Sequence, residues 1–205
     1  MGERHFYEPR HGHGLVHDPF NAIVAPRPIG WIGTRSADGV ANLAPYSFFN
    51  ALAYRPPTIG FASERRKDTV ANVEATGVFT WNLATRALAE AMNLTSATVP
   101  ADVDEFALAG LTAMRGRIVD APLVAESPVT FECRLSQIVP LTTADGAPMP
   151  NLFVIGEVVA VHIDRALVAD GVYRTAVARP ITRGGGPADY FEIGEAARFE
   201  MRRPD

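Results

Sequence analysis

Proline and glycine recur along the whole of this chain and divide it into short segments. There are 16 prolines and 17 glycines among 205 residues, with no internal repeat and no linker-like tract. Because proline interrupts helices and glycine permits tight turns, this spacing favours short strands over a helical bundle. Residues 129–136 alternate strictly between apolar and polar side chains, which predicts a strand with one buried and one solvated face. We therefore expect a mainly β domain, an antiparallel barrel with a few short helices; a sandwich is the alternative.

The predicted elements follow from the same patterns. Strands are expected at residues 28–34, 40–49, 58–63, 78–83 and 152–163. Pro45 interrupts the second of these, which indicates an edge strand or a bulge. Short helices are expected after Lys67, from Thr85 and from Asp104; Asp68 or Thr69 is the candidate cap of the first, and Gly77 its end. Residues 152–163 are apolar on both faces, so either an internal helix or another subunit should cover the second face.

Charge and cysteine content exclude several classes of protein. Lys and Arg number 19 and Asp and Glu 23, a net charge of −4, which argues against a nucleic-acid duplex or an anionic membrane as partner. The single cysteine, Cys133, excludes a disulfide framework, falls on the apolar face of its strand and suits a reducing cytoplasm. The N-terminus has no apolar signal-peptide core, and no stretch reaches the length of a membrane span. We expect a soluble cytoplasmic protein.

The strongest candidate for chemistry is the strand–loop–helix pattern at residues 58–76. Hydroxyl groups and fixed cations gather before the expected helix, at Ser63, Arg65, Arg66, Lys67 and Thr69. A helix start presents unpaired N–H groups and partial positive charge, so this combination suits a phosphate group. The alternative is a solvated basic turn before an ordinary helix. The segment lacks the glycines of a nucleotide-binding P-loop.

A second candidate lies at residues 42–50, where aromatic side chains alternate with small polar groups around Pro45. A planar heterocycle is bound by apolar faces and a few hydrogen bonds at its edge. The alternative is a core strand with aromatic packing.

Other chemistry-bearing residues are less informative. His5, His11, His13 and His17 crowd the N-terminus and form either a metal-binding tract or a flexible or interface segment; no carboxylate or cysteine accompanies them at ligand spacing. His162 is either a core histidine or a group beside a ligand or subunit boundary. The carboxylates of residues 102–105 are expected to cap and solvate a helix start. No hydrolase motif is present, and we expect no metal site.

Seven segments in succession resemble one family. They are PRPIGWIGT (26–34), NLAPYSFFN (42–50), KDTVAN (67–72), MNLTSA (92–97), DEFALAGL (104–111), ESPVTFEC (126–133) and IGEVVAVHID (155–164). Their order and spacing resemble the flavin reductase-like, FMN-binding split-barrel family. The branch of interest includes reductase components of two-component monooxygenases and flavoredoxin-like proteins. The resemblance covers roughly residues 15–190.

The resemblance implies a six-stranded antiparallel split β-barrel of Greek-key type that forms a homodimer with FMN at or near the subunit interface. We expect an irregular N-terminal arm at residues 1–20, the FMN-binding domain at 21–195 and a tail at 196–205. The resemblance implies that the FMN phosphate is held by Ser63, Arg65, Lys67, Asp68 and Thr69. It implies that the isoalloxazine is lined by Ala44, Pro45, Tyr46, Ser47 and Phe48. Asn50 and His162 are further flavin candidates, and Asn93 and Tyr190 resemble positions on the nicotinamide side.

The activity implied is hydride transfer from NADH or NADPH to FMN, which could supply reduced flavin to a partner monooxygenase. The cofactors carry this chemistry, so no catalytic side chain is assigned. One alternative is a flavoredoxin-like electron carrier without direct NAD(P)H activity. Another is a non-redox binding module that uses its histidine-rich N-terminus.

Overall fold

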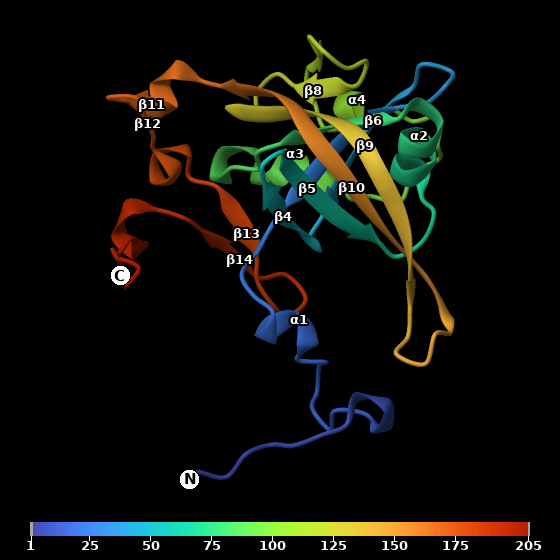
Figure 1. Ribbon diagram of the computed structural model, residues 1–205, viewed down its shortest axis with the longest axis vertical. Coiled ribbons are helices and arrows are strands. Elements are labelled where there is room, and N and C mark those ends of the chain that lie inside the picture. The colour runs from blue at the N-terminus through green and yellow to red at the C-terminus, as the bar shows by residue number, and fades with distance from the viewer. Residues whose placement is uncertain (1, 205) are drawn as a thin grey trace.

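The body of the protein is one antiparallel sheet that curls on itself. The computed structural model describes residues 2–204. Seven strands form the main sheet in the order β3-β2-β6-β9-β10-β5-β4. Figure 1 shows its two long strands, β9 and β10, side by side. The sheet curls until β3 meets β5: the rings of Tyr46 and Phe61 lie 4.6 Å apart, and the Ala62 N–H donates to the Phe48 carbonyl at 2.8 Å. The predicted mainly β barrel is therefore confirmed.

The strands and helices have the following bounds. The main-sheet strands are β2 Gly30–Arg35, β3 Ala41–Tyr46, β4 Phe49–Tyr54, β5 Pro57–Ser63, β6 Val78–Asn82, β9 Val129–Thr142 and β10 Pro148–Ile163. A three-stranded sheet contains β1 Arg27–Pro28, β13 Ile181–Arg183 and β14 Tyr190–Glu192, and two small pairs are β7 Ala113–Arg115 with β8 Pro122–Val124 and β11 Val168–Ala169 with β12 Val172–Tyr173. The α-helices are α1 Phe20–Ile23, α2 Asp68–Thr76, α3 Ala89–Leu94 and α4 Glu105–Leu108. Short 3-10 helices lie at Pro9–His11, Arg86–Leu88, Arg165–Leu167, Thr175–Ala178 and Glu195–Ala197.

The main sheet has seven strands where six are predicted, because residues 40–49 do not form one strand. β3 ends at Tyr46, and β4 begins at Phe49 and pairs with β5 instead. Pro45 itself stays inside β3, opposite Trp31. β3 lies at one end of the sheet order, so the edge position expected for this proline is confirmed.

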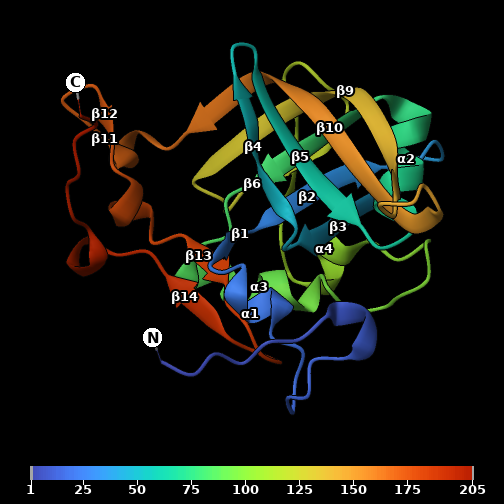
Figure 2. The same ribbon diagram turned by 60° about the horizontal axis from the view of Figure 1, so that its bottom comes forward.

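Two apolar clusters lie on opposite faces of β2, whose successive side chains alternate between them. Ile32 joins the barrel interior with Phe61, Phe79 and Cys133, all fully buried. Trp31 joins the second cluster, to which α3 contributes Met92 and α4 contributes Phe106. Figure 2 shows these two helices below β2 and β3. Burial raises the pKa of the Cys133 thiol, in keeping with its predicted place in the core.

The predicted solvated face of β9 is wrong at Thr130 and Glu132, which are 2 % and 0 % exposed. The loop that follows β7 covers this face, and the N–H groups of Arg117, Ile118 and Val119 donate to the Glu132 carboxylate at 2.9, 2.6 and 2.8 Å. The alternation of β9 is as expected; the cover comes from a segment with no regular pattern.

The two faces of β10 are covered unequally. Val154, Gly156 and Val158 face the barrel interior and are buried, whereas on the other face Ile155 is half-buried and Glu157 is exposed. Beyond a bulge between Val158 and Ala160, Val161 and Ile163 lie on the interior face as well, but at the end of the strand, where they are 52 % and 41 % exposed. No helix of the described chain covers the face of Ile155 and Glu157, so of the two covers expected for residues 152–163 the internal helix is wrong.

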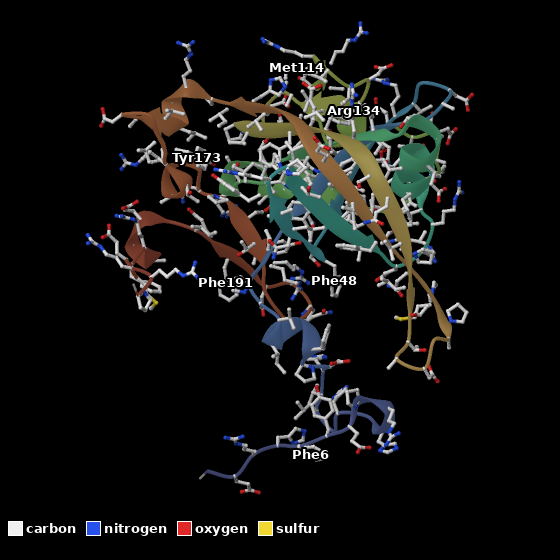
Figure 3. All side chains as sticks on the ribbon, in the orientation of Figure 1. Phe6, Phe48, Met114, Arg134, Tyr173 and Phe191 are labelled. Carbon is white, nitrogen blue, oxygen red and sulfur yellow. The ribbon has the colours of Figure 1, made fainter. Side chains whose placement is uncertain are left out.

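The N-terminal residues extend away from the barrel. Figure 1 shows this arm, residues 2–19, running below the barrel, and Figure 3 shows Phe6 on it, far from the sheet. Among residues 2–204, none of the helices has the length and apolar composition needed to cross a membrane.

Candidate functional site

A cavity of about 650 Å³ opens where the end of β3, the loop before α2, the loop after α3 and the loop after β13 converge. We call it the basic cavity. Its lining comprises Asn21, Arg27, Asn42, residues 44–48, Ala62, residues 64–69, residues 95–99, Glu105, Arg183, Gly184 and Gly186. The two segments singled out in the sequence, 44–48 and 64–69, thus form walls of one cavity.

The start of α2 has no side-chain cap. Lys67 is the N-cap residue, and neither Asp68 nor Thr69 caps the helix, contrary to expectation. The first N–H groups of a helix have no partner within it, so here they remain available to an anion. Gly77 ends the helix in a left-handed conformation, as predicted.

Three cations surround this helix start. Arg66 pairs with Glu74 at 2.6 Å, and Lys67 lies 3.8 Å from Glu64 across an exposed contact. Arg65 forms no ion pair within residues 2–204. Lys67 and Arg65 are therefore the cations least committed to carboxylates of the protein.

Ser63 and Thr69 shape the loop from inside. Both are 1 % exposed. The Ser63 hydroxyl donates to the Arg65 carbonyl at 2.7 Å, and the Thr69 hydroxyl donates to Asn42 Oδ1 at 3.0 Å. Their protons are thus used within the protein, and their role is to hold the turn.

The wall formed by Ala44, Pro45, Tyr46, Ser47 and Phe48 is partly apolar. Tyr46 is buried against Phe61, and burial raises the pKa of its hydroxyl, so it stays protonated. Phe48 is 45 % exposed and projects from the lower end of the sheet (Figure 3). Asn50 does not line this cavity; it lines an adjoining groove beside Leu52, which shares Arg27, Phe48 and Ala62 with the basic cavity.

Arg27 is a buried cation in the wall that the sequence did not single out. It is 8 % exposed and lies 5.5 Å from the Phe48 ring centre. Its guanidinium donates to the carbonyls of Ser47 at 3.2 Å and Gly184 at 3.3 Å, and also to those of Asn21 and Val24. Burial, together with the nearby charge of Arg183, lowers the pKa of Arg27.

Glu105 is a second residue of the cavity wall whose position the sequence did not reveal. Asp104 caps α4 as expected, accepting from the Phe106 and Ala107 N–H groups. Glu105, expected to be solvated, is instead 6 % exposed and lines the basic cavity. Burial raises the pKa of its carboxyl group.

A second cavity, of about 670 Å³, adjoins the first. We call it the Tyr190 cavity; Asn93 and Tyr190, both predicted on the nicotinamide side, line it. It shares Ser96 and Arg183 with the basic cavity. Arg183 lies 4.9 Å over the Tyr190 ring, at the boundary between the two.

His162 lines neither cavity. It pairs with Thr130 of β9, whereas the basic-cavity end of β10 pairs at Leu152 with Ser63. Ten strand residues separate these positions, a distance of about 30 Å. His162 Nε2 instead contacts Glu132 Oε1 at 2.6 Å. Burial alone would raise the pKa of Glu132, but the three backbone N–H groups and His162 outweigh it and lower that pKa to about 2.

The N-terminal histidines make only local contacts. His5 Nε2 lies 2.7 Å from the His13 carbonyl, and His11 contacts Glu8 at 2.9 Å. Within residues 2–204, no group of three or more His, Cys, Asp or Glu side chains gathers closely enough to hold a metal ion.

The curled antiparallel sheet and the cavity at its edge define the split-barrel flavoprotein class. The chain belongs to the family with a flavin reductase like domain, which it matches over residues 24–181. It is 36 % identical over 186 residues to the uncharacterized protein BH2278 of Halalkalibacterium halodurans, covering 88 % of this chain and 87 % of that protein.

Two solved structures have the same fold. Nitrilotriacetate monooxygenase component B from Bacillus cereus superposes with a TM-score of 0.87 at 29 % identity, covering 98 % of this chain and 100 % of that one. Flavoredoxin of Desulfovibrio vulgaris superposes with a TM-score of 0.76 at 24 % identity, covering 87 % of this chain and 91 % of that one, which is evidence for the fold alone.

Proposed function

We propose that the chain binds FMN in the basic cavity. The phosphate would lie at the start of α2, held by free N–H groups and by Arg65 and Lys67. The isoalloxazine would lie along residues 44–48. The observation that carries this proposal is the uncapped α2 start facing the same cavity as that partly aromatic wall.

The properties of the cavity suit this ligand. Its volume falls within the range of about 300–1,000 Å³ typical of small-molecule sites. Cations and amide donors lie at one end and apolar surface at the other, as a molecule with a charged tail and a planar ring system requires. Ser63, Asp68 and Thr69 would support the phosphate turn, and Ser47 would address the polar edge of the ring.

We further propose that the protein is an NAD(P)H:flavin oxidoreductase of the cytoplasm. Bound FMN supplies a ring that accepts a hydride from a reduced nicotinamide, and no protein acid or base is required. The Tyr190 cavity, with Asn93 and Tyr190, would receive the nicotinamide co-substrate beside the flavin. The likeness to a monooxygenase component supports delivery of reduced flavin to a partner monooxygenase.

A homodimer is also part of this proposal. The end of β10 exposes Val161 and Ile163, and the edge strand β4 exposes Leu52 and Tyr54. Exposed apolar side chains and an unpaired strand edge are typical of a subunit interface. Sedimentation equilibrium should give twice the mass of the chain; a monomer at micromolar concentration would contradict this part.

The function is tested by one spectroscopic series. The purified protein is titrated with FMN and with riboflavin, and the FMN complex is then mixed with NADH or NADPH in an anaerobic stopped-flow instrument. We expect tighter binding of FMN and rapid bleaching of the flavin band by one or both nicotinamides. Binding without bleaching would identify an electron carrier instead, and absence of flavin binding would refute the proposal.

A further inference from the structure

A chain of buried hydrogen bonds connects α4 to α2 beside the basic cavity. Glu105 Oε1 accepts from Asn42 Nδ2 at 2.9 Å, and Asn42 Oδ1 accepts from the hydroxyls of Thr34 and Thr69, both at 3.0 Å. Asn72 Nδ2 donates to the Thr34 hydroxyl at 3.1 Å. Every member is 9 % exposed or less, so water does not compete for these bonds.

The carboxylate determines the direction of every bond in this chain. An ionised carboxylate only accepts, and the Leu43 N–H occupies the second oxygen of Glu105 at 3.1 Å. The amide nitrogen of Asn42 must therefore face Glu105, which turns its carbonyl oxygen toward the two threonines. Two hydroxyl donors then fill both lone pairs of that oxygen, and the Thr69 side chain has one orientation.

These bonds anchor the part of α2 that matters for an anion. Thr69 and Asn72 are three residues apart, so they lie on one face of the helix, in its first turns. Both are held by groups whose orientation depends on Glu105. The placement of the uncapped N–H groups at the start of α2 consequently depends on a carboxylate that belongs to another element.

Simple electrostatics opposes a carboxylate in this place. Glu105 lines the same cavity as the α2 start, where a phosphate dianion would be repelled by it. A buried carboxylate is also costly unless hydrogen bonds satisfy it, and here they do so through Asn42 and Leu43.

We propose that Glu105, acting through Asn42 and Thr69, is a positioning residue that sets the phosphate-binding geometry of α2 and thereby the preference for FMN over riboflavin. The proposal rests on the FMN site proposed above. It predicts that removing a negative charge beside the phosphate weakens FMN binding, the opposite of what Coulomb repulsion alone predicts.

The first test compares two carboxylates of the basic cavity. In Glu105→Gln the new NH₂ group must face one of the two donors, Asn42 or the Leu43 N–H. The backbone N–H of Leu43 cannot rotate, so the glutamine oxygen faces it and the NH₂ group faces Asn42. The Asn42 amide then turns, and Thr69 loses its acceptor. We expect the Kd for FMN to rise about tenfold and that for riboflavin to change less than about twofold. The control is Glu64→Gln, an 83 % exposed side chain outside the network, for which FMN affinity should stay the same or increase.

The second test exchanges the two groups. In the double variant Asn42→Asp/Glu105→Gln, the glutamine donates to the aspartate and still accepts from Leu43, while the aspartate accepts from both threonines. Every bond of the network is restored, so the FMN-to-riboflavin affinity ratio should return to within about threefold of wild type. The exchange variant also keeps the test decisive if Glu105→Gln alone does not fold.

The outcomes separate this proposal from the one on which it rests. A wild-type protein that does not distinguish FMN from riboflavin refutes the phosphate site, and this inference with it. With a discriminating wild type, the inference is overturned if Glu105→Gln tightens FMN, leaves its Kd unchanged or weakens both flavins equally. It is also overturned if the exchange variant keeps the altered ratio or does not fold.

Discussion

Replacement of Lys67 by methionine tests the phosphate site most directly. The substitution keeps an unbranched side chain and removes one positive charge beside the uncapped start of α2. A charge-assisted hydrogen bond contributes about 1.5–3 kcal/mol. The Lys67 side chain is 44 % exposed, so water screens it and the lower end of that range applies. We expect a loss of about 1.5 kcal/mol, roughly a tenfold rise in the Kd for FMN.

The comparison ligand and a matched variant make this prediction specific. Riboflavin lacks the phosphate, so its affinity should change by less than about twofold, as fluorescence titration of both flavins will measure. Arg66→Met removes the same charge one residue earlier, but that guanidinium is already paired with Glu74 at 2.6 Å, so its effect should be clearly smaller. Equal losses for FMN and riboflavin in Lys67→Met would show that the phosphate does not lie at α2.

Three further predictions concern other parts of the molecule. The pKa of Glu132 is lowered to about 2 in the folded protein. The ionised carboxylate therefore stabilises the fold above the unfolded-state pKa, and this stabilisation is lost as the pH falls toward 2. The stability advantage of wild type over Glu132→Gln should therefore shrink by about 3 kcal/mol between pH 6 and pH 2 in denaturant titrations; a constant difference would contradict this. His162→Ala removes the contact with Glu132 and should lower the melting temperature, with the Kd for FMN within about twofold of wild type; an unchanged melting temperature would contradict this. Tyr190→Ala should raise the KM for the nicotinamide several-fold at unchanged FMN affinity, and an unchanged KM would exclude the Tyr190 cavity.

The parts of the site that could be predicted from the sequence are continuous segments. The cations of residues 65–67 directly precede α2 in the sequence, and the cavity wall at 44–48 is a single run of residues. In such segments the residue pattern and the local structure coincide, so propensity and charge carry the information. Even there the capping rule failed, because Thr69 lies in contact with Asn42, 27 residues earlier, and its hydroxyl bonds there instead.

The parts that were missed depend on partners far apart in the chain. Glu132 is buried because an irregular loop 13 to 15 residues away donates its N–H groups, and an alternating strand pattern cannot reveal such a cover. Glu105 looks like an ordinary helix-start acid until β3 supplies Asn42 and Leu43. The split of residues 40–49 into β3 and β4 was likewise hidden, since apolar composition continues across the break.

Through its contacts with four backbone carbonyls, Arg27 connects the basic cavity to segments that lie outside the barrel. All seven strands of the main sheet lie within residues 24–181, the stretch shared with the family. Asn21 and Gly184, to which the guanidinium donates, lie outside it at either end. A chain trimmed to the shared stretch would keep every strand of the main sheet, but it would lose one side of the basic cavity and two of the carbonyls that bind Arg27. The basic cavity thus needs more of the chain than the main sheet does.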